Sequence, residues 1–284
     1  TFATSAHITV TRTTVDHIEN PASIPAATPR FSWQTESDKS GVVQKSYRII
    51  VSSTPEKAAN GEGDLWDSGI RASRQQTLVP YGGKTLKDGT RAWWSVRIDT
   101  NKGASRWSAP APFGVGPLGE NRWGGRWIGL ESHGGDNRMK LHTELPARYL
   151  RKEFRLKELP VRRATAHISG LGLYRLFING AEVAPEEVLK PAPSDYRRTV
   201  YYNTYDVTDR IDTLTAVGIM LGNGRYFPPR ANKPHKIPYF GLPTCRLNLI
   251  VEYADGSRQR LATDETWRVT DRGPIRSNNE YDGE

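Results

Sequence analysis

The chain has 284 residues, of which 36% are hydrophobic, and its formal net charge is +9. This length is enough for two ordinary domains, and no apolar run approaches the roughly 20 residues of a membrane-spanning helix. The single cysteine, Cys245, excludes an internal disulfide framework, and we expect it to be a small buried apolar side chain. The positive charge would suit an anionic partner such as an acidic polysaccharide or nucleic acid; alternatively, it is an ordinary basic, solvated surface. The basic residues are spread in short groups without an RNA-binding aromatic motif, so we expect no nucleic acid binding.

Residues 1–118 predict one all-β domain with short strands separated by turns. The clearest strand is 91–98, where alternation puts Ala92, Trp94, Val96 and Ile98 on one face. Trp93 and Trp94 must then face opposite sides of the strand. We expect one of them in the core and the other at a domain interface or on a ligand platform. The closing pattern of this segment resembles a fibronectin type III-like module.

Residues 119–146 predict a linker and lead-in, because glycines punctuate them at short intervals. Its middle, Trp127-Ile128-Gly129-Leu130, is expected to begin the second domain. The stretch 133–146 has the composition of a loop. His133, Asp136 and His142 suggest metal ligands, but their spacing fits no tight zinc motif, so we expect no metal there.

Residues 147–284 predict a second β-sandwich. Strands are expected at 149–154, 214–221, 245–253 and 266–269. The strand at 214–221 is almost continuously apolar and is expected to be buried. Asn179-Gly180 is a strong hairpin signal, because both turn positions need positive φ.

Three pieces of this second region carry a family resemblance: GLGLYRLFING (170–180), VLKPAPSDYRRTVYYNTYDVT (188–208) and LGNGRYF (221–227). In motif and spacing they resemble the N-terminal β-sandwich domain of bacterial α-L-rhamnosidases, which are inverting glycoside hydrolases. Members of that family often begin with a fibronectin-like module. The resemblance implies an all-β chain, with a fibronectin III/Ig-like sandwich at 1–118 and a jelly-roll-like sandwich at 147–284.

The resemblance also implies where catalysis takes place. An inverting glycosidase uses a carboxylic acid and a carboxylate roughly 6.5–9.5 Å apart, and in this family both lie in a later α-helical barrel. The carboxylates of the second region stand at turns or on alternating strands, where turn capping or solvation is the ordinary role. They are Glu182, Glu186, Glu187, Asp195, Asp206, Asp264 and Glu265. We therefore expect no catalytic residue in this chain.

Three functions stay open at this point. The first is the non-catalytic N-terminal part of an α-L-rhamnosidase that hydrolyses terminal α-L-rhamnosyl residues. It would help recognise a rhamnose-containing glycan or brace the catalytic barrel, in a secreted or periplasmic enzyme of polysaccharide degradation. The second is a free-standing carbohydrate-binding module, and the third is a structural spacer. In the family the final segment, 281–284, runs on into further enzyme, so we expect the chain to be an N-terminal fragment.

The resemblance favours a binding site over an active site, because related domains in some rhamnosidases are carbohydrate-binding modules that hold rhamnose through a calcium ion. The resemblance places carbohydrate contacts at Asn179, Asn223 and Tyr226, and calcium ligands at Asn179, Asn223 and Pro228. The two asparagines are expected to meet at one end of the sandwich; alternatively, they stand there because asparagine tolerates left-handed backbone. Tyr226, Phe227 and Tyr239 would form a stacking platform or belong to the core.

Overall fold

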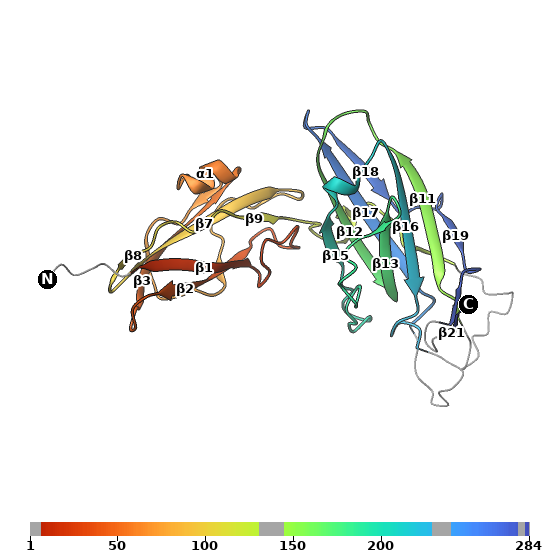
Figure 1. Ribbon diagram of the computed structural model, residues 1–284, viewed down its shortest axis with the longest axis horizontal. Coiled ribbons are helices and arrows are strands. Elements are labelled where there is room, and N and C mark those ends of the chain that lie inside the picture. Colours follow the sequence, from red (N-terminus) through yellow and green to blue (C-terminus); the bar gives the residue numbers. More distant parts are fainter. Residues whose placement is uncertain (1–6, 131–144, 229–239, 278–281, 284) are drawn as a thin grey trace. The chain divides into compact units, whose positions relative to one another are not determined.

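The computed structural model describes residues 7–130, 145–228, 240–277 and 282–283. The regular secondary structure of the described part consists almost entirely of antiparallel strands (Figure 1). The chain separates into two compact units, Thr1–Arg122 and Trp123–Glu284. This division falls just after the predicted border at 118, within the predicted lead-in of 119–146. Within the described residues no helix is long and apolar enough to cross a membrane.

The first unit holds two sheets. One joins β1 (Ile8–Val15), β2 (Arg30–Ser37) and β6 (Val79–Pro80). The other has β3 (Gln44–Ser52) and β7 (Arg91–Thr100) at its centre. Its smaller members are β4 (Trp66–Asp67), β5 (Arg71–Ala72), β8 (Gly103–Ala104) and β9 (Ala111–Gly114), and a short helix, α1 (Pro55–Ala59), follows β3. This pair of sheets confirms the all-β fold expected for the first domain.

The core of the first unit forms where inward-facing aromatic residues of the two sheets meet. The ring of Trp94, fully buried on β7, lies 4.6 Å from that of Phe31 on β2. Ala92, Val96 and Ile98 share the buried face of β7, which confirms the predicted alternation. Trp93 points the other way and is half-buried, with the Arg91 guanidinium 5.5 Å from its ring centre.

The second unit is a sandwich of two five-stranded antiparallel sheets, which we call sheet I and sheet II (Figure 1). Sheet I has the order β10 (Ile128–Gly129), β17 (Thr244–Tyr253), β12 (Val161–Leu171), β15 (Asn203–Asp206), and β18 (Arg258–Ala262) also pairs with β17. Sheet II has the order β14 (Ala181–Glu182), β13 (Leu173–Ile178), β16 (Leu214–Gly222), β11 (Arg148–Arg155), β19 (Arg268–Thr270). A separate hairpin joins β20 (Ile275–Ser277) and β21 (Asp282–Gly283).

The core of the second unit lies between these sheets, where seven of the eleven residues of β12 and seven of the ten residues of β17 are buried. Cys245 on β17 is fully buried, and burial raises the pKa of its thiol to about 12. It therefore has the predicted role of a small apolar side chain.

The apolar strand β16 differs from the expectation of complete burial. Val217, Ile219 and Leu221 point into the core, whereas Gly218 and Met220 are only half-buried on the outer face. The reason is that β16 lies in sheet II, one of the two layers of the sandwich, and only the inner face of that sheet meets the core. Sheet II thus presents apolar residues outward.

Candidate functional site

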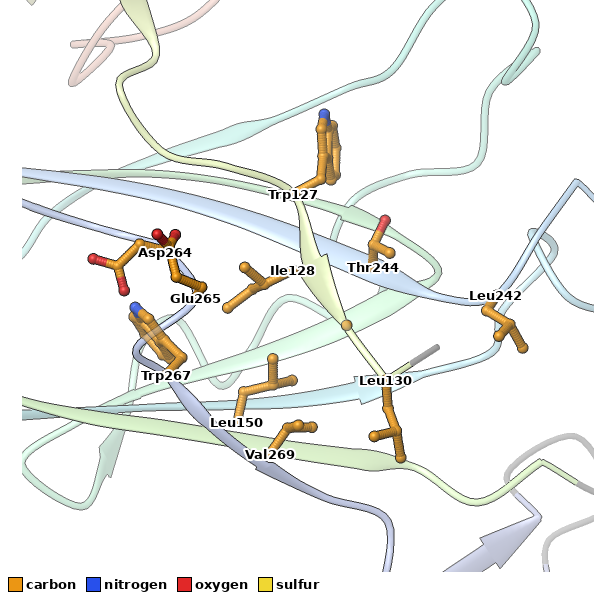
Figure 2. A pocket seen from close by; sticks show the side chains of 11 residues that line it. Trp127, Ile128, Leu130, Leu150, Leu242, Thr244, Asp264, Glu265, Trp267 and Val269 are labelled. Carbon is orange, nitrogen blue, oxygen red and sulfur yellow. The ribbon is translucent and has the colours of Figure 1, made fainter. Parts of the chain in front are cut away.

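A pocket of about 350 Å³ opens in the second unit between edge strands of its two sheets (Figure 2). β10, at the edge of sheet I, supplies Ile128. β19, at the edge of sheet II, supplies Val269, and the neighbouring β11 supplies Leu150. Because a β-sandwich is not closed at its sides, the gap between edge strands gives access to apolar side chains of the interior. We call this site the edge pocket.

The lining of the edge pocket is apolar at its centre. Ile128, Leu130, Leu150 and Val269 project toward the same space (Figure 2). Trp267 closes one side; the residue is 8% exposed, and its Nε1 donates a hydrogen bond to the Ala262 carbonyl at 3.0 Å. The apolar centre can accept an apolar group, while polar atoms make up a similar share of the lining.

Two carboxylates stand at the margin of the edge pocket, and both are already paired. Lys152 Nζ lies 3.0 Å from both oxygens of Asp264. The Thr266 hydroxyl donates to Asp264, and that hydrogen bond and the Lys152 charge hold the pKa of Asp264 below its usual range. Glu265 lies 3.3 Å from Arg126 Nη1. A general acid needs a raised pKa so that it is protonated at neutral pH, so Asp264 is unsuited to that role.

The predicted calcium site is not assembled, because the structure separates its two asparagines. Asn179 stands beside Ala216 at the start of β16, and its Oδ1 accepts a hydrogen bond from the Ala216 N–H at 2.8 Å. Asn223 directly follows the other end of β16. The seven residue-to-residue steps from Ala216 to Asn223 span roughly 24 Å in an extended strand. The expectation that both asparagines meet at one end of the sandwich is therefore wrong: β13 and β16 pair in antiparallel register, which places their turns at opposite ends.

Each asparagine also has a local structural role. Asn179 has φ +49° at the β13–β14 turn, and its Nδ2 donates to the Arg210 carbonyl at 2.9 Å. Asn223 is 1% exposed, and its Nδ2 donates to the Leu145 carbonyl at 3.0 Å. Pro228 is half-buried. No group of three or more histidine, cysteine, aspartate or glutamate side chains suited to a metal ion occurs among the described residues. These positions do not fit a shared calcium ion.

Tyr226, the third predicted carbohydrate contact, belongs to a partly exposed aromatic cluster. Its ring stacks on Phe240 at 5.8 Å and meets Tyr196 edge-on at 5.2 Å. Phe240 is 40% exposed, and the Arg197 guanidinium lies 5.8 Å from its ring centre. Of the other platform residues predicted with Tyr226, Phe227 is fully buried. Tyr239 lies outside the described residues, as do His133, Asp136 and His142.

Four of the other candidate carboxylates, Glu182, Glu187, Asp195 and Asp206, hold structural contacts. Glu187 accepts a hydrogen bond from the Tyr205 hydroxyl at 2.7 Å. Asp206 accepts from the Thr208 hydroxyl at 2.6 Å, as expected for a turn cap. Glu182 pairs with Lys190 at 2.8 Å.

The sequence did not reveal the edge pocket as a site. The sequence predicts that Trp127-Ile128-Gly129-Leu130 begins the second domain and that 266–269 is a strand, yet these two segments lie far apart in the chain. Their meeting depends on the pairing of β10 with β17 and of β19 with β11. No local pattern encodes those two partners.

The fold and the sites together define the class of protein: a pair of all-β accessory domains. Their candidate carboxylates, such as Asp264 and Asp206, form structural contacts. Comparison with known proteins gives the family. Residues 159–284 match the model "Alpha-L-rhamnosidase N-terminal domain", and residues 10–119 match "Rha78A-like, N-terminal immunoglobulin domain". The two domains of the chain thus correspond to the N-terminal region of α-L-rhamnosidases.

Individual relatives agree along nearly the whole chain. An α-L-rhamnosidase of Formosa agariphila is 36% identical over 93% of this chain, which covers 30% of that protein. The structure of the α-L-rhamnosidase from Dictyoglumus thermophilum superposes with a TM-score of 0.81 at 31% identity, over 94% of this chain and 30% of that one. The Streptomyces avermitilis enzyme, at 22% identity and a TM-score of 0.82, shares the fold over 95% of this chain and 42% of its own. The chain thus spans about 30% of the length of the curated relatives it matches.

Proposed function

We propose that this chain is the non-catalytic N-terminal part of an α-L-rhamnosidase that hydrolyses terminal α-L-rhamnosyl residues, in a secreted or periplasmic enzyme. The observation that carries the proposal is the match of both domains, in order, to the N-terminal region of relatives bearing that name. The candidate carboxylates support the proposal, because they have structural roles: Asp264 forms an ion pair with Lys152, and Asp206 caps a turn. The acid and base of an inverting hydrolase then belong to another part of the enzyme.

The role of the second unit in that enzyme is to brace the remaining domains. The edge pocket supports this role, because its centre is apolar and its two marginal carboxylates are already paired with Lys152 and Arg126. A sugar would need free polar groups there, whereas an apolar side chain of a neighbouring domain needs only the space.

Activity measurements test the assignment. Turnover of an aryl α-L-rhamnoside is measured for the enzyme that contains this sequence and for residues 1–284 alone. We expect turnover by the enzyme and none by the isolated residues. Hydrolysis by residues 1–284 alone would contradict the proposal.

A charged side chain introduced into the edge pocket tests whether the pocket braces the remaining domains of the enzyme. Leu130→Asp is expected to lower the melting temperature of the whole enzyme while leaving that of residues 1–284 nearly unchanged, because Leu130 is half-buried at the pocket. Val188→Asp is the matched control, since Val188 is 87% exposed. Equal effects of the two variants on the whole enzyme would exclude bracing through this pocket.

A second candidate function, carbohydrate binding, is favoured by the cluster of Tyr226, Tyr196 and Phe240. Exposed aromatic faces are suited to stacking on sugar rings. Calorimetric titration with L-rhamnose, first with calcium and then with chelator, tests it. Heat that disappears in Tyr226→Ala would support binding at the cluster. Dependence on calcium would require a metal site other than the one predicted from Asn179 and Asn223.

A further inference from the structure

The outer face of sheet II carries a groove of about 380 Å³ that the sandwich core does not use. Its lining is mostly apolar. Gly218, in the middle of β16, forms the floor, and register places it between Arg151 on β11 and Phe177 on β13. In Figure 1 these strands lie side by side in the order β13, β16, β11, β19. Tyr149 and Met220, in the adjacent row, complete the walls.

Packing within the sheet does not require glycine at the floor. A Cβ atom at Gly218 would meet only the Cβ of Phe177 at 3.7 Å and the Leu150 carbonyl at 4.0 Å, which are ordinary contacts. Glycine weakens a strand interior and often marks a place where a ligand approaches the backbone closely. The missing side chain of Gly218 is what leaves the groove open.

The aromatic wall at Tyr149 is held in place from behind. Gly273 passes so near that a Cβ there would lie 2.0 Å from the Tyr149 ring. The Tyr149 hydroxyl accepts a hydrogen bond from the Ile275 N–H at 3.3 Å. A ring that is already fixed loses little conformational entropy when a ligand stacks on it.

Two arginines of the groove face each other across neighbouring strands. Arg151 on β11 is the direct register partner of Arg268 on β19. Like charges in this position destabilise a sheet. Arg151 is partly neutralised by Glu153. Arg268 is exposed and forms no ion pair with the residues that the structure describes. An anion bound at this end of the groove would relieve the repulsion.

From these observations we infer that the groove binds a carbohydrate unit bearing a carboxylate or sulfate group. The anionic group pairs with Arg268 and Arg151, and a C–H face of the sugar packs against Tyr149 over the floor at Gly218. The volume lies at the lower end of the range for small-ligand sites, which suits one or two sugar units. The net charge of +9 attracts such a ligand at long range. This inference goes beyond the proposed function and is independent of where hydrolysis takes place.

Calorimetric titration of residues 1–284 tests the inference with three probes: a galacturonic acid trimer, a sulfated neutral trimer and an unmodified neutral trimer. We expect at least one anionic probe to bind and the neutral trimer to give no heat. Preference between the two anionic probes identifies the group that the site takes. Arg268→Gln should weaken binding about tenfold or more, as for the loss of a charge-assisted hydrogen bond.

Two further variants distinguish specific binding in the groove from non-specific electrostatic attraction to the basic chain. Gly218→Val should fill the floor and abolish binding, while the melting temperature is maintained or raised because valine favours strands. Arg74→Gln, an equal charge change on an exposed residue of the first unit, should leave binding unchanged. Equal weakening by Arg74→Gln and Arg268→Gln, binding that survives Gly218→Val, or no heat with either anionic probe would overturn the inference. Tighter binding of a short acidic peptide would instead assign the groove to a protein partner.

Discussion

Lys190 is buried, with 2% of its surface exposed, and its ammonium group is fully satisfied. Nζ donates to Glu182 Oε1 at 2.8 Å, to the Val183 carbonyl at 3.1 Å and to the Ala184 carbonyl at 2.8 Å. An ammonium has three protons to donate, so none is left without an acceptor. The Lys190 carbonyl in turn accepts from the Tyr174 N–H at 2.7 Å. This one residue therefore ties the loop after β14 to β13.

Replacement of Lys190 should show how much these hydrogen bonds contribute to stability. In Lys190→Met the Val183 and Ala184 carbonyls lose their donor and Glu182 keeps only Arg175, so we expect the free energy of unfolding to fall by about 3 kcal/mol. Urea denaturation of residues 1–284 measures it. Lys157→Met, on an exposed residue of the same unit, should change stability by no more than roughly 0.5 kcal/mol. Similar values for the two variants would show that the buried contacts contribute little.

The lowered pKa of Glu182 predicts how the stability of the chain depends on pH. Its hydrogen bond with Arg175, and then its contact with Lys190, lower its pKa from 4.5 to about 2. A lowered pKa in the folded state contributes stability that is complete above 4.5 and is lost as the pH falls toward 2. We expect the wild-type chain to lose more stability between pH 5 and 2.5 than Glu182→Gln does, measured by urea denaturation at each pH. Parallel pH profiles would contradict this prediction.

At the scale of elements, the link between β12 and β13 carries the chain from sheet I to sheet II within one residue. That residue is Gly172, with φ +128°, and a Cβ there would lie 2.3 Å from the Gly222 carbonyl. The GLGLY motif is thus explained by a crossing between layers where no side chain fits. The same crossing starts the register of β13 against β16, at Leu173 and Gly222.

Substitution at this crossing should therefore be more damaging than at an ordinary turn glycine. Gly172→Ala combines an unfavourable backbone conformation with a steric clash, and we expect a loss of about 3 kcal/mol or more. Gly256→Ala is the comparison, because Gly256 also has positive φ (+84°) but nothing within 4 Å of a Cβ; it should cost about 1 kcal/mol. Chemical denaturation of both variants gives the difference, and equal losses would rule out the steric contribution.

At the scale of the whole molecule, the described core residues fall into two clusters that share no member. One contains Phe31 and Trp94 in the first unit, and the other contains Leu249 and Tyr253 in the second. Each unit has its own buried apolar residues and its own sheets, which is the physical definition of a domain.

Separate cores predict separate unfolding. We expect scanning calorimetry of residues 1–284 to resolve two transitions. Phe31→Ala should lower only one of them and Leu249→Ala only the other, by the few kcal/mol that a large cavity costs. A single transition that both variants shift together would show that the two domains unfold as one unit.

The sequence alone determined features that depend on neighbours in the chain. Alternation in 91–98 predicted the buried face of β7, because successive side chains of a strand point to opposite sides. Asn179-Gly180 predicted a turn, since its backbone requirement is local. The motifs at 170–180, 188–208 and 221–227 predicted the family, and both family models confirm it.

Tertiary structure decided everything that depends on which strands become neighbours. Register placed Asn179 and Asn223 at opposite ends of the paired strands β13 and β16, which overturned the shared calcium site. Pairing of distant segments created the edge pocket. Because only one face of β16 packs on the core, Gly218 lies on the outer face of sheet II and is not buried. The physical reason is the same in each case: the period of a strand fixes which residues share a face, whereas long-range packing fixes what that face meets.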